Sequence, residues 1–207
     1  MPKNILVIDS SPNGANSLSR KLAADTVAQL QAKYPGSTVR TRDLDKNPLP
    51  HLTGTTVAAF FTPPDSLTPE LAAAIKLSDA ATDELLAADI IVIGAPMWNF
   101  SIPSVLKAWI DHVVRRGRTF AYSATGAEGL AKGKTVFLAL SRGAKYAEAP
   151  YKQMEFHETY LRGVLGFIGI TDVHAIIAEG ASMGPDGAKN AIAAAEQQLA
   201  AVMTKAA

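Results

Sequence analysis

Residues 88–114 decide the fold of this chain, and they read ADIIVIGAPMWNFSIPSVLKAWIDHVV. Ile90–Ile93 are four consecutive aliphatic residues, a pattern typical of a strand that is buried on both faces, as in a parallel sheet. Gly94 and Pro96 are expected to end that strand in a loop. Pro103 fits the first turn of a helix whose apolar residues recur at helical spacing and would face the sheet. The stretch therefore predicts a buried strand, a loop and a helix, in that order.

Strands and helices alternate along the rest of the chain. Further strands are predicted at Ile5–Ile8, Thr38–Leu44, Lys134–Leu140 and Asp172–Ala178, with the second of these at an edge of the sheet. Further helices are predicted to begin near Ser17, Thr68, Pro150 and Gly184. Residues 45–69 are expected to form a long proline-containing excursion with a short helical turn at best, and residues 119–133 a surface hairpin. Five strands alternating with helices predict a doubly wound parallel α/β sheet in the flavodoxin-like order 2-1-3-4-5.

The composition favours one domain spanning residues 1–207 and excludes several kinds of site. The chain is 48% hydrophobic, which supports a sizeable core, and no linker divides it. It has no cysteine, so disulfides, thiolate metal sites and cysteine nucleophiles are excluded. A formal charge of +1 gives no electrostatic argument for binding nucleic acid or an anionic membrane. No signal peptide or membrane-spanning helix is recognised, so a cytoplasmic protein is expected.

Loops rich in polar or aromatic residues follow the first, third and fourth predicted strands, at Ser10–Ser19, Pro96–Phe100 and Ser141–Ala144. In open α/β sheets ligands bind outside the carboxyl ends of the strands, so these loops would meet at one rim. The second loop offers backbone amides for the polar edge of a flat ligand such as a flavin, and apolar side chains for its ring face. The alternative is that its aromatic residues are loop residues packed onto the sheet.

The first loop is a candidate phosphate site. Ser11, Ser17 and Ser19 supply hydroxyl groups, and the N-terminus of the following helix presents free amides and a partial positive charge. Arg20 could add a counter-charge or be a solvated surface residue. Ser17 could instead simply cap the helix, and the two roles are compatible.

Other nucleotide-binding and catalytic motifs are absent or incomplete. The chain has no Walker pattern and no Gly-x-Gly-x-x-Gly after the first strand, so a nicotinamide nucleotide would have to visit and leave. Gly180–Gly184 matches the Gly-x-Ser-x-Gly elbow of hydrolases, but the last histidine, His174, precedes Ser182, whereas that fold needs its histidine last. A phosphoacceptor receiver domain would need paired acids after the first strand, where only Asp9 stands. The histidines show no metal-ligand spacing, so no metal site is predicted.

Four segments agree in order and spacing with one known family: Ala95–Phe100, Gly129–Lys134, Ser141–Gly143 and Leu165–Val173. By these residues the chain resembles the FMN-dependent NAD(P)H azoreductases, also described as quinone reductases, over nearly its whole length. The resemblance implies a homodimer with one bound FMN per protomer, in which the neighbour completes each site. NAD(P)H would be a transient co-substrate.

The resemblance also implies roles for individual residues. The family's phosphate-binding positions match Ser11, Ser17, Leu18 and Ser19. The positions that line the isoalloxazine ring and ribityl chain match Met97, Trp98, Asn99 and Phe100, with Pro96 beside them. The loop whose backbone amides meet the pyrimidine edge of the flavin matches Ser141, Arg142, Gly143 and Ala144. The aromatic positions that flank the substrate space match Tyr122 and Phe167, and Tyr146 is expected to border that space.

The chain departs from the family pattern at several of these positions. Leu18 stands where the family often has Gln, Trp98 where it often has Tyr, and Ala144 where a second Gly is common. Phosphate binding should survive Leu18, because amides and hydroxyls perform it. Trp98 and Tyr146 alter the pocket wall, and so bear on substrate preference.

The hypothesis from the sequence is a ping-pong oxidoreductase, in which NAD(P)H reduces the flavin and a quinone or azo compound then takes the hydride in the same slot. No side chain is predicted as a catalytic acid. One alternative is a flavodoxin-like electron carrier, but such carriers are usually acidic, and the +1 charge and the excursion at residues 45–69 argue against it. The others are a flavin-binding regulatory or scaffold protein and a serine hydrolase acting through Ser182.

Overall fold

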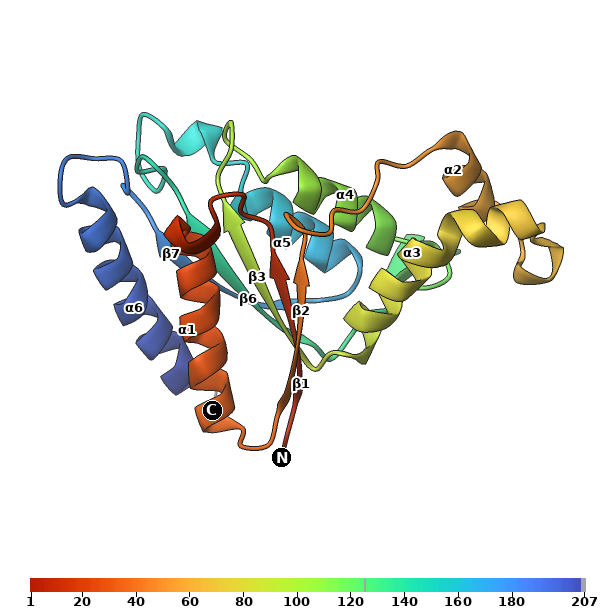
Figure 1. Ribbon diagram of the computed structural model, residues 1–207, viewed down its shortest axis with the longest axis horizontal. Helices are drawn as coiled ribbons and strands as arrows, with labels where there is room; N and C mark the ends of the chain where they lie inside the picture. The colour runs from red at the N-terminus through yellow and green to blue at the C-terminus, as the bar shows by residue number, and fades with distance from the viewer. Residues whose placement is uncertain (125, 206–207) are drawn as a thin grey trace.

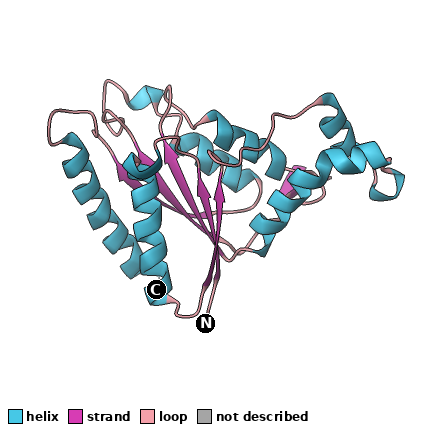
Figure 2. Cartoon of the chain, viewed as in Figure 1, coloured by secondary structure: helices cyan, strands magenta, loops and turns pink. Residues whose placement is uncertain are grey.

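A five-stranded parallel sheet forms the centre of the protein (Figures 1 and 2). The computed structural model describes residues 1–124 and 126–205. The strands of this sheet are β1 (Asn4–Asp9), β2 (Thr38–Asp43), β3 (Ile90–Pro96), β6 (Thr135–Ser141) and β7 (Asp172–Ala178). Their spatial order is β2-β1-β3-β6-β7. The predicted flavodoxin-like order is confirmed, because β6 and β7 are the predicted fourth and fifth strands.

Burial of the strands follows their position in the sheet. The central strand β3 carries Ile90–Ile93, none of which exposes more than 4% of its surface. Strand β2 lies at the edge, as predicted, and is mostly exposed along its length. Strand β3 also continues through Gly94 to Pro96, two residues that the sequence predicted would end it. Gly94 is required inside the strand because a Cβ there would lie 2.7 Å from Oδ1 of Asp9.

Helices cover both faces of the sheet. One face carries α1 (Leu18–Lys33) and α6 (Gly187–Lys205), which lie side by side in Figure 1. The other face carries α3 (Pro69–Ala87), α4 (Ser104–Val113) and α5 (Glu158–Phe167). Trp109 of α4 packs there and is 2% exposed. Each face therefore has its own apolar core, and both cores bury aliphatic residues of the central strands.

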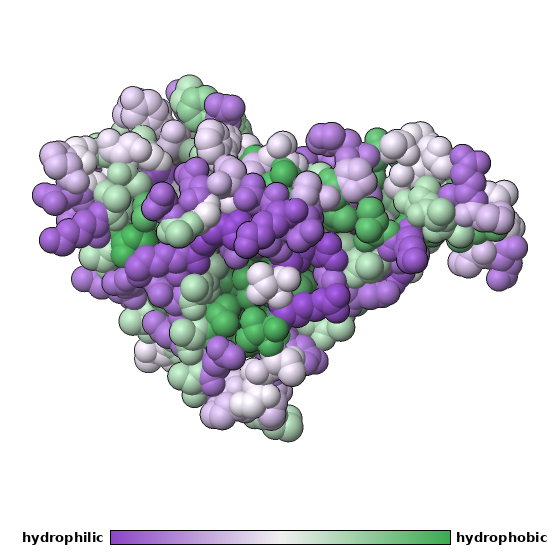
Figure 3. Space-filling model, viewed as in Figure 1, coloured by the Kyte–Doolittle hydropathy of each residue, from purple (hydrophilic) through white to green (hydrophobic). Residues whose placement is uncertain are grey.

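An arm projects from the sheet where the sequence predicted a short helical turn at best (Figure 1). It contains α2 (Gly54–Phe61), a full helix of eight residues, followed by a 3-10 turn at Pro64–Ser66. The Thr53 side chain caps α2 by accepting a hydrogen bond from the N–H of Thr56. Contacts from distant residues also hold it, including the Arg115 guanidinium, which lies 4.5 Å from the centre of the Phe60 ring. On the face seen in Figure 3 hydrophilic residues predominate, with smaller groups of apolar residues between them.

The helix predicted to open at Pro150 begins later. A 3-10 turn occupies Lys152–Met154, and α5 starts only at Glu158. The Glu155 carboxylate accepts hydrogen bonds from the N–H groups at the beginning of α5, and so acts as its cap. Met154, which would lie inside a helix that opened at Pro150, instead precedes α5 and is 36% exposed.

The boundaries of β7 agree with the prediction at both ends, and most of the others differ from it by one to three residues. Pro103 immediately precedes α4 instead of lying in its first turn, and α6 begins at Gly187 instead of near Gly184. The predicted surface hairpin is confirmed as β4 (Phe120–Ser123) paired antiparallel with β5 (Gly126–Gly129). Thr125, inside that predicted hairpin, lies outside the described residues.

Candidate functional site

Four loops meet at one edge of the sheet, because β1, β3, β6 and β7 run parallel and end there. They enclose a cleft of about 210 Å³. Its lining residues are Ser11, Asn13, Asn16, Ser17, Leu18, Pro96, Met97, Trp98, Ser141, Arg142, Gly143, Ala181 and Ser182. The three loops singled out in the sequence are thus brought together, and the turn after β7 joins them.

The start of α1 forms one end of the cleft. Ser17 caps the helix, because its Oγ accepts a hydrogen bond from the N–H of Arg20 at 3.3 Å. The Ser17 hydroxyl also lies 3.1 Å from that of Ser19, which is completely buried beneath the cleft. The N–H of Leu18 has no acceptor in the described part of the chain. Hydroxyl groups, an unpaired amide and the positive end of the helix suit a phosphate group.

Arg20 supports this end of the cleft through hydrogen bonds to the surrounding protein. Its Nε and Nη2 donate to the carbonyl oxygen of Ser11 at 3.0 and 2.8 Å, and its guanidinium binds both carboxylate oxygens of Asp43. Asp9 lies 3.4 Å away. The interpretation of Arg20 as a solvated surface residue is wrong, since only 17% of its side chain is exposed. Because of these hydrogen bonds, the donor groups of the Arg20 guanidinium point at protein acceptors.

The two aspartates beside Arg20 have opposite pKa shifts. Hydrogen bonding to the guanidinium holds the pKa of Asp43 below its ordinary value. Burial raises the pKa of Asp9 despite the nearby positive charge, and its Oδ1 is buried without a partner in the described chain. Asp43 is therefore the stronger partner of Arg20.

A tight turn follows β3 and carries the aromatic residues. Trp98 and Ser101 exchange backbone hydrogen bonds of 2.9 and 3.0 Å, so Asn99 and Phe100 occupy the two central positions. Both have positive φ angles, 46° and 72°. This is the conformation of a type I′ turn, which Asn adopts readily but which is strained for Phe. The turn holds Trp98 and Phe100 partly exposed, at 48% and 41%.

The loop after β6 forms the other end of the cleft. The N–H of Arg142 donates to the carbonyl of Ala178 at 2.8 Å, so it cannot also serve a ligand. The N–H groups of Gly143 and Ala144 have no acceptor among the described residues. Of the four residues predicted for this loop, these two therefore keep amides available for a polar edge of a ligand.

The side chain of Arg142 faces the protein interior and is 3% exposed. Its guanidinium lies 2.8 Å from Glu155, 3.2 Å from Glu179 and 3.6 Å from Glu158. Burial alone would raise the pKa of Glu155, but hydrogen bonds from the start of α5, together with Arg142, bring that pKa below its ordinary value. The buried arginine thus joins the loop after β6 to α5 and to the turn after β7.

His157 lies beside this cluster and is completely buried. Burial, with a further contribution from Arg142, lowers the pKa of His157 to about 3. Neither of its ring nitrogens has a partner within the described residues. The preceding residue, Phe156, donates its N–H to the carbonyl of Phe100 at 3.1 Å. The segment that Arg142 fixes therefore also supports the strained turn.

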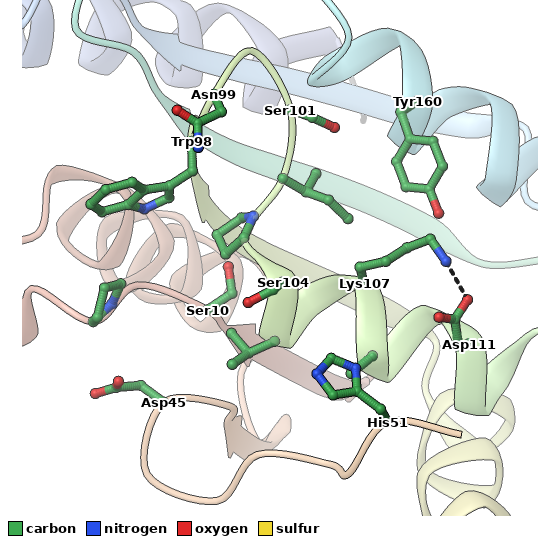
Figure 4. Close-up of a pocket in the computed structure, with 15 residues that line it drawn as sticks. Ser10, Asp45, His51, Trp98, Asn99, Ser101, Ser104, Lys107, Asp111 and Tyr160 are labelled. Carbon is green, nitrogen blue, oxygen red and sulfur yellow. Dashed lines mark hydrogen bonds and ion pairs between the residues drawn. The ribbon is translucent and has the colours of Figure 1, made fainter. Parts of the chain in front are cut away.

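A second cavity, of about 770 Å³, adjoins the cleft at Trp98, which lines both. Asn99 also lines this cavity. Figure 4 shows the Trp98 side chain at one side of it and Tyr160 at the other, beside the ion pair of Lys107 and Asp111. The lining is mainly apolar, and His51 points into it from the loop after β2. The cavity has room for a ring system larger than the cleft alone could hold.

The three aromatic residues predicted for the substrate space separate into two places. Tyr146 lies near the turn, with its ring 6.3 Å from that of Phe100. Tyr122 and Phe167 pack on Phe120 instead, at 5.5 and 4.8 Å. That cluster follows the far end of α4, a helix of ten residues and thus about 15 Å long. Neither Tyr122 nor Phe167 lines the cleft or the second cavity of its own chain.

Comparison with known proteins agrees with this geometry. Residues 3–203 match the model of a family described as having a flavodoxin-like fold. The chain belongs to that flavodoxin-like family. Curated relatives include FMN-dependent NADH:quinone oxidoreductase 2 of Trichormus variabilis (strain ATCC 29413 / PCC 7937), which is 49% identical over 199 residues, or 95% of this chain and 96% of the relative. The FMN-dependent NADH:quinone oxidoreductase of Herminiimonas arsenicoxydans is 49% identical over 189 residues, or 91% and 93% of the two chains.

Solved structures similar to this flavodoxin-like protein include the azoreductase from Bacillus anthracis str. Sterne. The two superpose with a TM-score of 0.90 at 32% sequence identity, and the match covers 98% of this chain and 99% of the other. The similarity therefore extends over the loops that build the cleft as well as over the sheet.

Four lining residues of the flavodoxin-like cleft were absent from the sequence prediction: Asn13, Asn16, Ala181 and Ser182. The two asparagines belong to the predicted phosphate loop, so their position after the first strand could have found them. The pair after β7 was considered only as a hydrolase elbow. The Ser182 hydroxyl makes no hydrogen bond to a histidine within the described residues, which argues against that use.

Two kinds of feature are absent from the described residues, 1–124 and 126–205. These residues contain no group of His, Asp and Glu side chains that could hold a metal ion. None of their helices combines the length and the apolar composition needed to cross a membrane.

Proposed function

We propose that this protein is an FMN-dependent oxidoreductase that uses NADH or NADPH to reduce quinones and azo compounds. The observation that carries the proposal is the arrangement of groups around the cleft. Hydroxyls and an unpaired amide at the start of α1 suit a phosphate, and the free amides of Gly143 and Ala144 suit a polar ring edge. The half-exposed Trp98 stands between them, next to the larger cavity. The names of the relatives support the same reaction.

In this proposal each group of predicted residues would bind a different part of the cofactor. The phosphate would lie against Ser11, Ser17 and Leu18, with Ser19 holding the Ser17 hydroxyl from beneath. The ring would lie along the turn formed by Pro96, Met97, Trp98, Asn99 and Phe100. Its pyrimidine edge would meet the loop formed by Ser141, Arg142, Gly143 and Ala144, with Gly143 and Ala144 as the donors.

FMN held by these residues would supply the redox chemistry, which is hydride transfer from NAD(P)H to a quinone or to an azo bond, and an azo bond needs two such rounds to become two amines. The N–H groups of Gly143 and Ala144 would favour negative charge at the pyrimidine edge, as oxyanion-hole donors do. We infer a ping-pong order, in which both substrates use the cavity beside Trp98 in turn. The lack of a Rossmann motif for the nicotinamide nucleotide supports this order.

We further infer a homodimer in which each site is shared. Tyr122 and Phe167 are exposed, at 63% and 40%, yet they lie beyond the far end of α4 from the cleft. If these two residues flank the substrate, a second copy of the chain must supply them. Tyr146 would come from the same chain as the cleft, since it lies beside Phe100. A cytoplasmic location stays a prediction.

Reconstitution of the purified protein with FMN tests the proposal. We expect stoichiometric binding, with quenched flavin fluorescence, and steady oxidation of NADH when a quinone is added. Initial rates at several quinone concentrations should give parallel double-reciprocal lines. Heat-denatured protein with the same FMN is the control for free-flavin chemistry. Binding without turnover would favour an electron carrier or a scaffold protein, and a lack of binding would overturn the proposal.

The shared site can be tested by mixing two inactive variants. Trp98→Ala alters the cleft side of a site, and Tyr122→Ala alters the side expected from the neighbour. Co-expressed subunits with different affinity tags would form a mixed dimer in which one site is unaltered. We expect that mixed dimer to recover activity that neither parent has. Recovery without dimer formation, or no recovery in a confirmed dimer, would contradict a shared site.

A further inference from the structure

The turn Gly180–Met183, between β7 and α6, is bound to the loop after β6 by three successive hydrogen bonds. The N–H groups of Gly180, Ala181 and Ser182 donate to the carbonyl oxygens of Ala144, Arg142 and Gly143 at 3.2, 3.0 and 2.9 Å. The sequence drew attention to this turn as a hydrolase elbow, a role that the function proposed above does not use. Its hydrogen bonds instead make it a second layer behind the loop expected to hold the flavin edge.

The side chain of Ser182 lies against Gly143 at the wall of the cleft. A Cβ on Gly143 would be 3.1 Å from the Ser182 Oγ and 3.6 Å from its Cβ. A larger residue at this place would therefore press on the hydroxyl, which would have to shift by a few tenths of an ångström. The Ser182 Oγ has no hydrogen-bond partner in the described residues, and the residue is exposed. A polar group is thus directed at the ligand space and left unused by the protein.

Without Ser182, this wall of the cleft has free hydrogen-bond donors but few free acceptors. The amides of Gly143 and Ala144 can only donate, and the carbonyl oxygens of the same loop already accept from the turn. The imide edge of a flavin presents two acceptors, its carbonyl oxygens, and one donor, the N3–H between them. A serine hydroxyl can accept as well as donate, so Ser182 offers the N3–H an acceptor that makes no hydrogen bond within the described residues.

We propose that Ser182 is a further cofactor-binding residue, whose hydroxyl accepts the N3–H of the flavin while the neighbouring amides donate to its carbonyl oxygens. The inference rests on the proposed function, because it needs FMN in the cleft. It also gives the serine of the elbow-like sequence a binding role in place of a nucleophilic one.

A cycle of one protein change and one ligand change tests this contact. The dissociation constants of FMN and of N3-methyl-FMN would be measured by flavin fluorescence, with the unaltered protein and with Ser182→Ala. We expect the variant to bind FMN about five- to tenfold more weakly, the effect of one lost hydrogen bond. The variant and the unaltered protein should bind N3-methyl-FMN alike, since that ligand has no N3–H to donate.

Two control variants accompany the cycle. Ser182→Thr keeps the hydroxyl and should keep the affinity for FMN. Ser66→Ala, in the exposed 3-10 turn of the arm, should change neither dissociation constant. The melting temperature of each apoprotein, measured in parallel, reports whether Ser182→Ala still folds. Ser182→Thr provides a second comparison, because it should retain its affinity for FMN.

The outcomes separate the inference from the proposed function. An unchanged FMN affinity in Ser182→Ala, or an equal loss for both ligands, would overturn the role of Ser182 while the unaltered protein still bound FMN. If the unaltered protein failed to bind FMN, the proposed function and this inference would both be overturned. A loss confined to FMN would support the contact with N3–H.

Discussion

Two arginines brace the two ends of the cleft, and they do so in different surroundings. Arg20 stands at the phosphate end, 17% exposed, and holds the carbonyl of Ser11 together with Asp43. Arg142 stands at the ring end, 3% exposed, and faces three glutamates. Both were considered from sequence as groups near the ligand. In the structure both guanidinium groups turn to the protein, and the ligand is left to amides and hydroxyls.

The two arginines differ in the charged groups that would lose their partner if each side chain were removed. Removing the Arg20 side chain leaves two carboxylates, Asp9 and Asp43, which are 14% and 16% exposed. Removing that of Arg142 leaves three carboxylates, 14–23% exposed, around a position that is itself 3% exposed, next to the buried His157. Buried charges without a partner cost much more than exposed ones. We therefore expect Arg142 to determine whether the protein folds, and Arg20 to determine how well one loop is placed.

The largest expected effect is that of Arg142→Met. The substitution keeps much of the side-chain volume but leaves three carboxylates around an uncharged group. We expect the free energy of unfolding to fall by about 3 kcal/mol. Urea unfolding followed by circular dichroism measures it, and Arg142→Lys, which keeps the charge, should lose less. If Arg142→Met and the unaltered protein were equally stable, the contrast between the two arginines would be wrong. The free energy cost of burying the charged cluster would then equal the stabilisation that the cluster contributes.

The next effect concerns His157 and acid. Its pKa is about 3 in the folded protein, below its ordinary value of 6.5, so the unfolded chain binds a proton that the folded one does not. Stability contributed in this way is present above about pH 6.5 and is lost as the pH falls, by up to about 1.4 kcal/mol per pH unit. We expect His157→Met to remove this dependence between about pH 6.5 and 5.

Urea unfolding at neutral and mildly acid pH would measure the slope for both proteins. The exposed His51, altered to Gln, is the matched control and should leave the acid dependence unchanged. If His157→Met lost stability in acid as steeply as the unaltered protein, the burial of a neutral histidine beside Arg142 would not be the cause.

The smallest expected effect on stability is that of Arg20→Lys. An ammonium group cannot bind both oxygens of Asp43 and the carbonyl of Ser11 together, as the planar guanidinium does. We expect a loss of about 1 kcal/mol in stability, because the site is near the surface. If the protein binds FMN as proposed, the affinity should fall about tenfold, because the Ser11 loop is displaced.

Riboflavin, which lacks the phosphate, distinguishes the two explanations for Arg20→Lys. Its affinity should be unaltered if the arginine positions only the phosphate loop. Equal losses of FMN and riboflavin would show that Arg20 supports the whole cleft, and the contrast between the two arginines would then disappear.

The predictions from sequence were correct where a local pattern was enough. A run such as Ile90–Ile93 can be satisfied only between two covered faces, so the central strands and their order followed from the alternation with helices. The loops after these strands could be placed at one rim for the same reason. Their polar and aromatic residues were visible as departures from the apolar pattern.

The sequence failed where a distant partner decided the local structure. The start of α5 depends on the Glu155 carboxylate, and that carboxylate is fixed by Arg142 of another strand end. The directions of the Arg20 and Arg142 side chains depend on carboxylates brought near by the sheet. The cleft-lining position of Ser182 depends on hydrogen bonds to Gly143, far away in the chain.

The sequence by itself thus determined the strands, their order and the edge at which the loops gather, because apolar periodicity and turn residues act on neighbours along the chain. The tertiary structure alone decided which groups remain free to bind a ligand. Each charged side chain and amide takes whatever partner lies nearest in space, so what is left over for a ligand is known only once all the partners have been placed.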